Sequence, residues 1–150
     1  MISLIYLFEV APEYIIKRDD KINNKFMIHK HYAKRAGLHY DLRFGYEGVL
    51  KSFACRKIIE LIDGKVKKIS AFQQPDHDAS WFDFEGEITD GYGAGKVQLW
   101  DKGKFEIIQW KPRAITLLFA GKKLKGEFSF ILYKPPSQWL MFRSTIAKFD

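Results

Sequence analysis

Short apolar segments that alternate with polar residues and end at turn residues are the feature that most constrains this chain. They are rich in Phe, Tyr, Trp, Ile and Val, which is typical of β-strands, and they include KFMIHKH, LHYDLRF, GVLKSFAC, WFDFEGEI, KVQLWD, GKFEIIQW, GEFSFILY and QWLMFRS. Turn residues at 45–48 (GYEG) and 101–103 (DKG) predict two hairpins. Only residues 113–124 (RAITLLFAGKKL) suggest a helical period, so we expect few and short helices.

Many strands in one chain favour a closed architecture, because an open sheet would leave long unpaired edges. We therefore predict a mainly β fold, a small closed or nearly closed β-barrel with a few short flanking helices. With 150 residues, 47% of them apolar, the sequence predicts one domain, with an arm over 1–25 and a barrel that carries the site over 26–150. The opening MISLIYLFEV is too short to span a bilayer, so we expect a core strand or arm and no membrane association.

Basic residues outnumber acidic ones and give a formal net charge of +7. In the second half of the chain they recur at Lys102, Lys104, Lys111, Arg113, Lys122, Lys123 and Lys125. This balance suits a phosphate-rich partner such as nucleic acid. Charge alone does not choose between a nucleic-acid surface and an ordinary solvated one.

Cys55 is the single cysteine of the chain, which excludes an intramolecular disulfide and a cysteine-based zinc knuckle. We expect a reducing, cytoplasmic location. Cys55 ends the segment SFAC, where a small buried side chain is a simpler interpretation than a nucleophile, because free cysteines are usually buried.

The segment LHYDLRF places three functional side chains at every second position. In a strand His39, Asp41 and Arg43 share one face, while the apolar residues between them form a core face. One interpretation is a solvated face on which the carboxylate pairs with its neighbours. The other is a site, because an imidazole, a carboxylate and a guanidinium in one row are unusual on a strand that merely faces water.

A neighbouring segment, FMIHKHY, strengthens the second interpretation. There His29 and His31 share a face, and two adjacent strands could direct His31, His39 and Asp41 at one point. Two neutral imidazoles and a carboxylate suit a divalent transition metal and leave positions open for substrate and water. Arg43 would then be a bidentate group for a phosphate or carboxylate on that metal.

Downstream, the segment PDHD places His77 before FDFEGE, where its imidazole could meet a metal-bound oxyanion as a hydrogen-bond donor or proton source. The glycine-rich segment 90–97 (DGYGAGKV) lacks the order of a P-loop. We expect it to form a tight turn into a strand.

The segments HKHYAKRAGLHYDLRFGYEGVLKSFACRK, PDH, FDFEGEITDGYGAGKVQLWDKG and SQWLMF, in this order, resemble the phosphoesterase-domain family of bacterial DNA ligase D and its stand-alone archaeal relatives. The resemblance implies a small β-barrel enzyme that depends on manganese, with Co²⁺ or Zn²⁺ as alternatives. It implies trimming of 3'-terminal ribonucleotides and removal of 3'-phosphates in end-joining repair, alongside a DNA ligase and a polymerase.

The resemblance also implies roles for individual residues. Those of the metal ligands fall on His31, His39 and Asp41. Those of the groups that hold the scissile phosphate fall on Arg43 and His77, with a further phosphate contact from Lys57.

Three residues mark where this chain departs from, or only weakly matches, the family it resembles. His29 stands where many relatives have Gln, and Trp81 stands where a Tyr is common. APE, at 11–13, is similar to the family's TPE and points weakly to Glu13. Since His29 shares the face of His31, we expect it near the site, where it would orient a ligand or contact the phosphate.

Two other functions fit parts of the pattern. His39 and Asp41 with the distant His77 could form the facial triad of an iron(II) oxygenase, although 150 residues is short for such a barrel. A non-catalytic nucleic-acid-binding module would use the aromatic residues to stack bases and the lysines to contact phosphates. That module would leave the alignment of His39, Asp41 and Arg43 unexplained.

Overall fold

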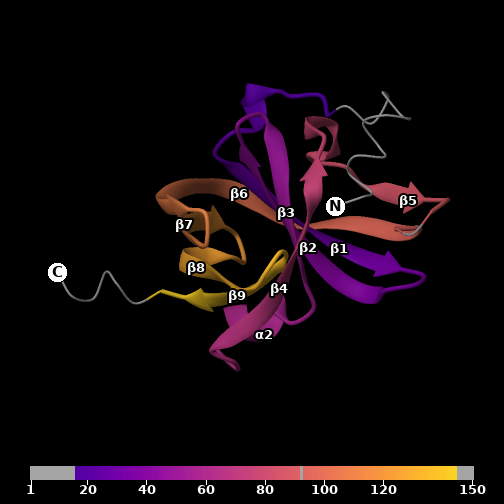
Figure 1. Cartoon of the computed structure of the whole chain (residues 1–150). Coiled ribbons are helices and arrows are strands. Elements are labelled where there is room, and N and C mark those ends of the chain that lie inside the picture. Colours follow the sequence, from indigo (N-terminus) through magenta and orange to yellow (C-terminus); the bar gives the residue numbers. More distant parts are fainter. Residues whose placement is uncertain (1–15, 92, 145–150) are drawn as a thin grey trace.

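A computed structural model describes residues 16–91 and 93–144, and it is mainly β, as predicted. Its elements are η2 (Asp20–Ile22), β1 (Lys25–Ala33), β2 (Gly37–Tyr46), β3 (Val49–Cys55), α2 (Ile58–Ile62), β4 (Lys68–His77), η3 (Ala79–Trp81), β5 (Gly86–Ile88), β6 (Gly95–Lys111), β7 (Ala114–Gly121), β8 (Lys125–Lys134) and β9 (Gln138–Arg143) (Figure 1). The predicted arm strand at 1–10 and Glu13 lie outside the described residues.

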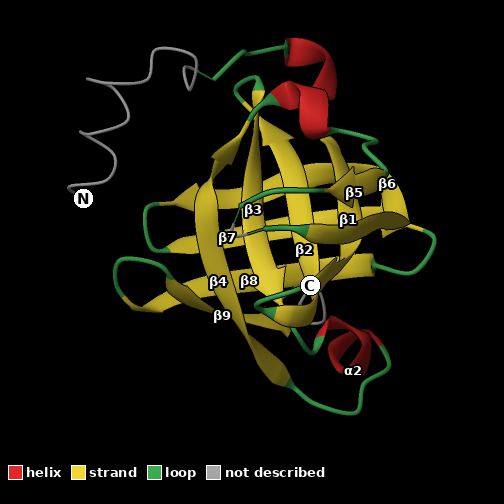
Figure 2. Cartoon of the chain, turned by 90° about the vertical axis from the view of Figure 1, so that its right-hand side faces the viewer, coloured by secondary structure: helices red, strands yellow, loops and turns green. Residues whose placement is uncertain are grey.

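The strands close into an antiparallel barrel, which confirms the predicted fold class. Neighbours follow the order β1-β2-β3-β4-β9-β8-β7-β6, and β6 pairs back with β1 to complete the ring (Figure 2). The 17-residue β6 makes this closure possible, since residues 95–104 pair with β1 and residues 103–111 pair with β7. Among the described residues no helix is long and apolar enough to cross a membrane.

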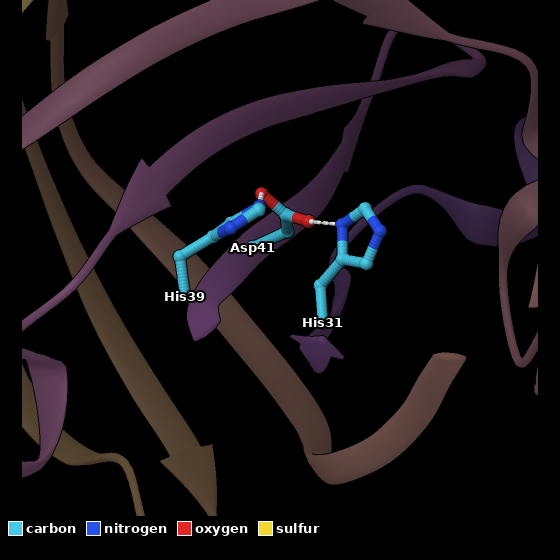
Figure 3. Close-up of side chains that lie close together, drawn as sticks. All are labelled: His31, His39 and Asp41. Carbon is cyan, nitrogen blue, oxygen red and sulfur yellow. Dashed lines mark hydrogen bonds and ion pairs between the residues drawn. The ribbon is translucent and has the colours of Figure 1, made fainter. Parts of the chain in front are cut away.

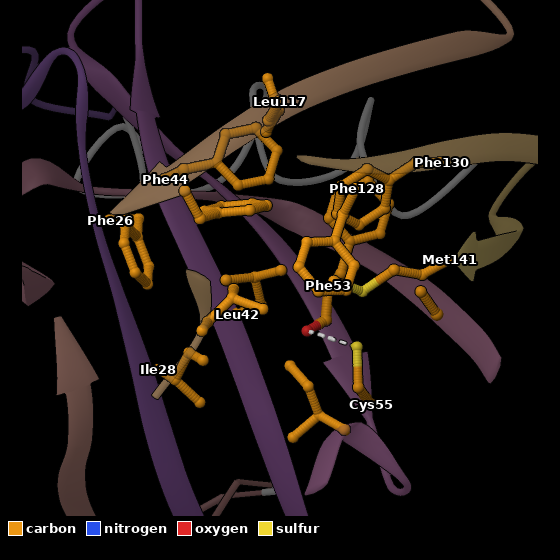
Figure 4. Packing of buried hydrophobic residues seen from close by; sticks show 14 of the residues in the cluster. Phe26, Ile28, Leu42, Phe44, Phe53, Cys55, Leu117, Phe128, Phe130 and Met141 are labelled. Atoms are coloured by element: carbon orange, nitrogen blue, oxygen red, sulfur yellow. Dashed lines mark hydrogen bonds between the residues drawn. The ribbon is translucent and has the colours of Figure 1, made fainter. Parts of the chain in front are cut away.

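Alternation along the strands gives the barrel wall two distinct faces. The inner face carries the main core, in which Phe26, Ile28, Leu42, Phe44 and Phe53 are at most 1% exposed (Figure 4). A smaller apolar cluster on the outer face contains Ile22, Met27, Leu50 and Ala79, with Trp81, Phe82 and Leu99 packed against it. The outer face of β1 and β2 is therefore covered by other residues and shielded from solvent. Polar side chains on this face are consequently buried.

Three local features agree with the sequence. The hairpin at 45–48 joins β2 and β3, and its central residues Glu47 and Gly48 both have positive φ (51° and 81°), as a tight hairpin turn requires. The helices are short, and α2 buries Ile58 and Leu61 in the main core. Cys55 is fully buried in the same core, and burial raises the pKa of its thiol, so it is no nucleophile.

Three secondary-structure predictions were wrong. Of the segment WFDFEGEI, predicted to be a strand, only Gly86–Ile88 is one (β5), because the chain first forms the 3-10 helix η3. Residues 101–103 do not form a hairpin, because β6 runs straight through them. Asp101 instead accepts hydrogen bonds from the amides of Lys122, Lys123 and Leu124 at the β7–β8 turn. Gly103 permits close strand packing, since a Cβ there would lie 2.2 Å from the carbonyl oxygen of Ala120.

The segment 113–124 is also not helical, because it forms strand β7 and the turn that follows it. Its inward residues Ile115, Leu117 and Phe119 are spaced by two and pack in the main core. Burial against other strands decides the conformation of this segment over its weak helical period.

Candidate metal centre

Strands β1 and β2 bring the predicted ligands together. Their antiparallel register pairs His31 with His39 and His29 with Asp41, so all four side chains lie on the outer face of the wall. The ligand atoms of His31, His39 and Asp41 lie within 4.8 Å of one another, and the two imidazoles flank the carboxylate (Figure 3). Within the described ranges this is the one cluster of three or more His, Cys, Asp or Glu that could hold a metal ion.

Backbone carbonyls fix the protonation of both imidazoles. His31 donates from Nε2 to the carbonyl oxygen of Gly93 (2.8 Å), and His39 donates from Nδ1 to that of Gly37 (3.1 Å). The other nitrogens face the carboxylate, with His31 Nδ1 at 3.3 Å from Asp41 Oδ2 and His39 Nε2 at 3.3 Å from Asp41 Oδ1. In the neutral state each imidazole therefore points a lone pair at Asp41.

This arrangement needs a cation at its centre. A bare ring nitrogen and a carboxylate oxygen are both acceptors, so they do not attract each other unless a proton or a metal ion lies between them. An imidazole that donates its remote N–H to a backbone carbonyl is also the usual form of a histidine metal ligand. The three donors of His31, His39 and Asp41 therefore fit a divalent transition metal.

The electrostatics agree with a site that attracts positive charge. Burial on its own would raise the pKa of Asp41, but the hydrogen bonds that His31 and His39 donate when protonated and the charge of Arg43 hold it well below its usual range. Burial likewise opposes protonation of His39, yet contact with Asp41 raises its pKa overall. The carboxylate thus stays ionised and available to a metal.

Arg43 is held rigidly beside the carboxylate. It is 6% exposed, and it donates from Nε to His29 Nδ1 (3.1 Å) and from Nη1 to Ser52 Oγ (2.9 Å), while Nη2 lies 3.5 Å from Asp41 Oδ2. His29 in turn donates from Nε2 to the carbonyl oxygen of Phe84 (2.8 Å). Burial and the charge of Arg43 lower the pKa of His29 to about 4, which keeps its Nδ1 free to accept.

His29 therefore lies behind Arg43 and has no exposed surface. Both of its ring nitrogens are engaged, one by Arg43 and the other by a backbone carbonyl. Of the two roles expected from the sequence, this placement favours orientation of a site residue over contact with phosphate.

A cavity of about 300 Å³ opens beside these groups and is lined by His31, His39, Asp41 and Arg43 together with Gln74, His77 and Trp81. His77 packs edge-on against Trp81, with ring centroids 6.0 Å apart, and Arg43 lies 5.9 Å from the centroid of the same indole. Burial and the charge of Arg43 lower the pKa of His77 to about 4. Its Nδ1 is buried without a hydrogen-bond partner in the described structure.

Lys57 takes a position that the sequence did not suggest. It is the exposed N-cap residue of α2 and does not line the cavity. The side chain of its neighbour Arg56 donates hydrogen bonds to the carbonyl oxygens of Ala36 (2.6 Å) and Leu38 (3.2 Å), close to His39 in the chain.

Two residues of the site escaped the sequence analysis. The two-residue turn at 47–48 sets the register of β2 and β3, in which Arg43 pairs with Ser52. The position of Ser52 beside Arg43 could therefore have been predicted from the turn. Gln74 had no such signal, because its place depends on how β4 pairs with β3 after an intervening helix.

Comparison with known proteins gives consistent matches. The family described as DNA Ligase D 3'-phosphoesterase domain matches residues 29–132. The multifunctional non-homologous end joining protein LigD of Mycolicibacterium smegmatis is 34% identical over 90% of this chain, and that of Pseudomonas aeruginosa is 36% identical over 80%. The corresponding DNA repair protein of Mycobacterium tuberculosis is 42% identical over 80%. The chain spans only 18%, 15% and 16% of these relatives, respectively.

Proposed function

The chain belongs to the DNA ligase D 3'-phosphoesterase domain family, and from this premise we propose that it is a metal-dependent phosphoesterase that removes 3'-phosphates from nucleic acid ends. The observation that carries the proposal is the pair of imidazole lone pairs that converge on the Asp41 carboxylate beside a buried guanidinium. The imidazoles and the carboxylate can bind a metal cation, and the neighbouring guanidinium can bind a phosphate that is coordinated to that cation.

His31 through Nδ1, His39 through Nε2 and Asp41 through its carboxylate would hold the metal, for which we propose Mn²⁺, with Co²⁺ or Zn²⁺ as substitutes. When bound, the ion supplies Lewis-acid polarisation of a phosphoryl oxygen. The same donor set would suit iron(II), but Arg43 and family membership favour a phosphate ester over an oxygenase substrate. For the third ligand we propose His31 and not His77, which the oxygenase triad would use, because His31 lies in one cluster with His39 and Asp41.

Arg43 binds and orients the phosphate in this proposal. Its guanidinium is fixed by His29 and Ser52, so little conformational entropy is lost when it contacts the substrate. Negative charge that develops on the phosphoryl oxygens meets a positive charge already in place, which is the favourable condition for electrostatic catalysis.

We assign His77, which lines the same cavity, a hydrogen bond to the phosphate. Its lowered pKa keeps the ring neutral at pH 7, so we assign it one N–H that is donated to a phosphate oxygen rather than a full positive charge. The unpartnered Nδ1 supports this assignment. Trp81 fixes the ring by its edge-to-face contact.

The proposed product is a 3'-OH end, the form that a polymerase extends and a ligase seals. We propose that this chain acts with such enzymes in end joining, and that 3'-terminal ribonucleotides are a second substrate of the same site. The relatives carry non-homologous end joining in their names, and each is several times longer than this chain.

The proposal is tested with a primer–template whose primer ends in a 3'-phosphate. Protein stripped with EDTA is incubated with and without added Mn²⁺, and the product is scored by whether a polymerase can extend it. We expect extension only with Mn²⁺ and only with wild-type protein, with His39→Ala as the inactive control. Extension at equal rates without any divalent ion, or none with Mn²⁺, Co²⁺ or Zn²⁺, would overturn the proposal.

A further inference from the structure

A second cavity, of about 190 Å³, lies at one end of the barrel interior, and we call it the mouth pocket. It is lined mainly by aromatic residues and lysines, namely Phe44, Phe53, Trp110, Trp139, Lys51 and Lys111. The mouth pocket shares the strands β2, β3 and β4 with the candidate metal centre but opens on the other face of the wall. Phe44 follows Arg43, Phe53 follows Ser52, and Gln73 of the mouth pocket precedes Gln74 of the metal-site cavity.

Its aromatic walls are held in fixed orientations. Trp110 stacks on Tyr46 with ring centroids 4.0 Å apart and an interplanar angle of 9°, and its ring meets that of Phe44 edge-on at 6.1 Å. Trp139 is anchored by a hydrogen bond from Nε1 to Gln73 Oε1 (3.0 Å). Trp139 is buried, whereas Trp110 is half-buried and keeps part of its ring surface accessible. A fixed indole of this kind loses little entropy when a second flat group stacks on it.

The rim of the mouth pocket is basic. Lys51 lies over the Tyr46 ring and is paired with Asp76, whose Oδ2 is 3.0 Å from its Nζ. Lys111 is exposed and forms no ion pair with any described residue, so its charge is available to a ligand. Aromatic faces with cationic side chains at the edge match a base with its phosphate.

We propose that the mouth pocket binds an unpaired nucleotide of the nucleic acid whose 3' end occupies the metal centre. The base would stack against the Trp110 side of the pocket, and Lys111 would contact its phosphate. This inference rests on the proposed function for its substrate class. Charge complementarity selects the occupant, since the chain carries a net charge of +7 and the pocket combines a free lysine with stacking surfaces.

The test measures binding without turnover. A fluorescent single-stranded oligonucleotide that ends in a 3'-OH is titrated with protein in EDTA, and anisotropy gives the Kd. We expect Trp110→Leu to raise the Kd about tenfold, which corresponds to the loss of one base stack. Lys111→Gln should raise it several-fold, because one phosphate contact is lost.

Lys104→Gln is the matched control, because Lys104 is an exposed lysine of the same strand away from the pocket and the change removes the same charge. It should change the Kd less than twofold. Equal effects of Lys111→Gln and Lys104→Gln would show that only net charge matters and would overturn the proposal. Trp110→Leu also alters packing, so its far-ultraviolet circular dichroism and melting temperature are compared with those of the wild type.

A scan with abasic nucleotides tests the stack without any change in the protein. One abasic position should weaken binding to wild-type protein about tenfold, and the same position should have no effect on Trp110→Leu. No sensitive position in the wild type, or equal sensitivity in both proteins, overturns the inference. Because the scan uses neither a metal nor a 3'-phosphate, its failure leaves the phosphatase assay untouched, and failure of that assay leaves the scan interpretable.

Discussion

The two faces of strands β1 to β3 carry opposite chemistry in the same stretch of chain. The inner face is an aromatic core, in which Phe44 and Phe53 have stacked rings with centroids 5.9 Å apart. The outer face holds the buried His31 and Asp41 and the half-buried His39, which are joined by polar contacts. Strand alternation thus places a core and a site back to back, one residue apart.

The difference lies in what satisfies each buried group. Core residues of the inner face need only shape and apolar contact, which many residues can supply. On the outer face every polar atom needs a specific partner, since an unpaired buried charge or hydrogen-bonding group is costly. Substitutions in the closely packed core of the inner face should therefore change stability, whereas those at the metal centre on the outer face should change metal binding and turnover.

The largest effect is expected for the proposed metal ligands. His31→Ala, His39→Ala and Asp41→Ala should each abolish Mn²⁺ binding and 3'-phosphatase activity, because a three-ligand site rarely tolerates the loss of one. Binding is measured by titration of Mn²⁺ into apoprotein, and folding is monitored by circular dichroism. A variant that keeps wild-type Mn²⁺ affinity would remove that residue from the ligand set.

Next in size is a change on the inner face alone. Phe53→Ala should lower the free energy of unfolding by about 3–5 kcal/mol, because it leaves a cavity in the main core. Urea denaturation measures the change. Below the unfolding transition the folded variant should still bind Mn²⁺, and loss of metal from folded protein would show that the two faces are not separable.

Arg43→Ala should keep the metal and lose turnover. Removing a fixed charge from the phosphate site costs roughly 2–4 kcal/mol of transition-state stabilisation, seen as a fall of kcat/KM. Ser52→Ala is a milder companion, because Arg43 keeps its contact with His29. If Arg43→Ala also lost Mn²⁺, the guanidinium would be acting on the metal ligands and not on the phosphate.

The smallest effect is expected at His29, where two substitutions test whether its hydrogen bond with Arg43 matters for turnover. His29→Gln should stay within about threefold of wild-type kcat/KM, since its amide can accept from Arg43 and donate to the carbonyl of Phe84 as the imidazole does. His29→Ala should lose roughly tenfold, with Mn²⁺ affinity unchanged, because one hydrogen bond to a charged group is removed. Equal activities of the two variants would show that His29 does not position Arg43.

Much of this site was predictable because it is local. The hairpin turn at 47–48 and the period of two place His39, Asp41 and Arg43 on one face, and β1 adds His31 through the adjacent hairpin. The carbonyl partners were not predictable. Gly93 is 62 residues from His31, and Phe84 is 55 residues from His29, so their positions depend on the tertiary fold.

The errors have a related cause. The residues 101–103 have turn composition, but their local preference loses to pairing of β6 with β1 and β7 on its two sides. Lys57 is exposed at the start of α2 and does not line the cavity, so its phosphate contact, which rests on resemblance alone, stays a prediction. Composition predicts that the chain is rich in strands better than it predicts where a long strand continues through a glycine.

Anomalous diffraction from crystals soaked in Mn²⁺ tests the central claim most directly, because it locates the ion and its ligand atoms. The tautomers fixed by Gly37 and Gly93 predict one peak bounded by His31 Nδ1, His39 Nε2 and the Asp41 carboxylate. A peak on His31 Nε2, or one away from these three residues, would contradict the assignment of this centre.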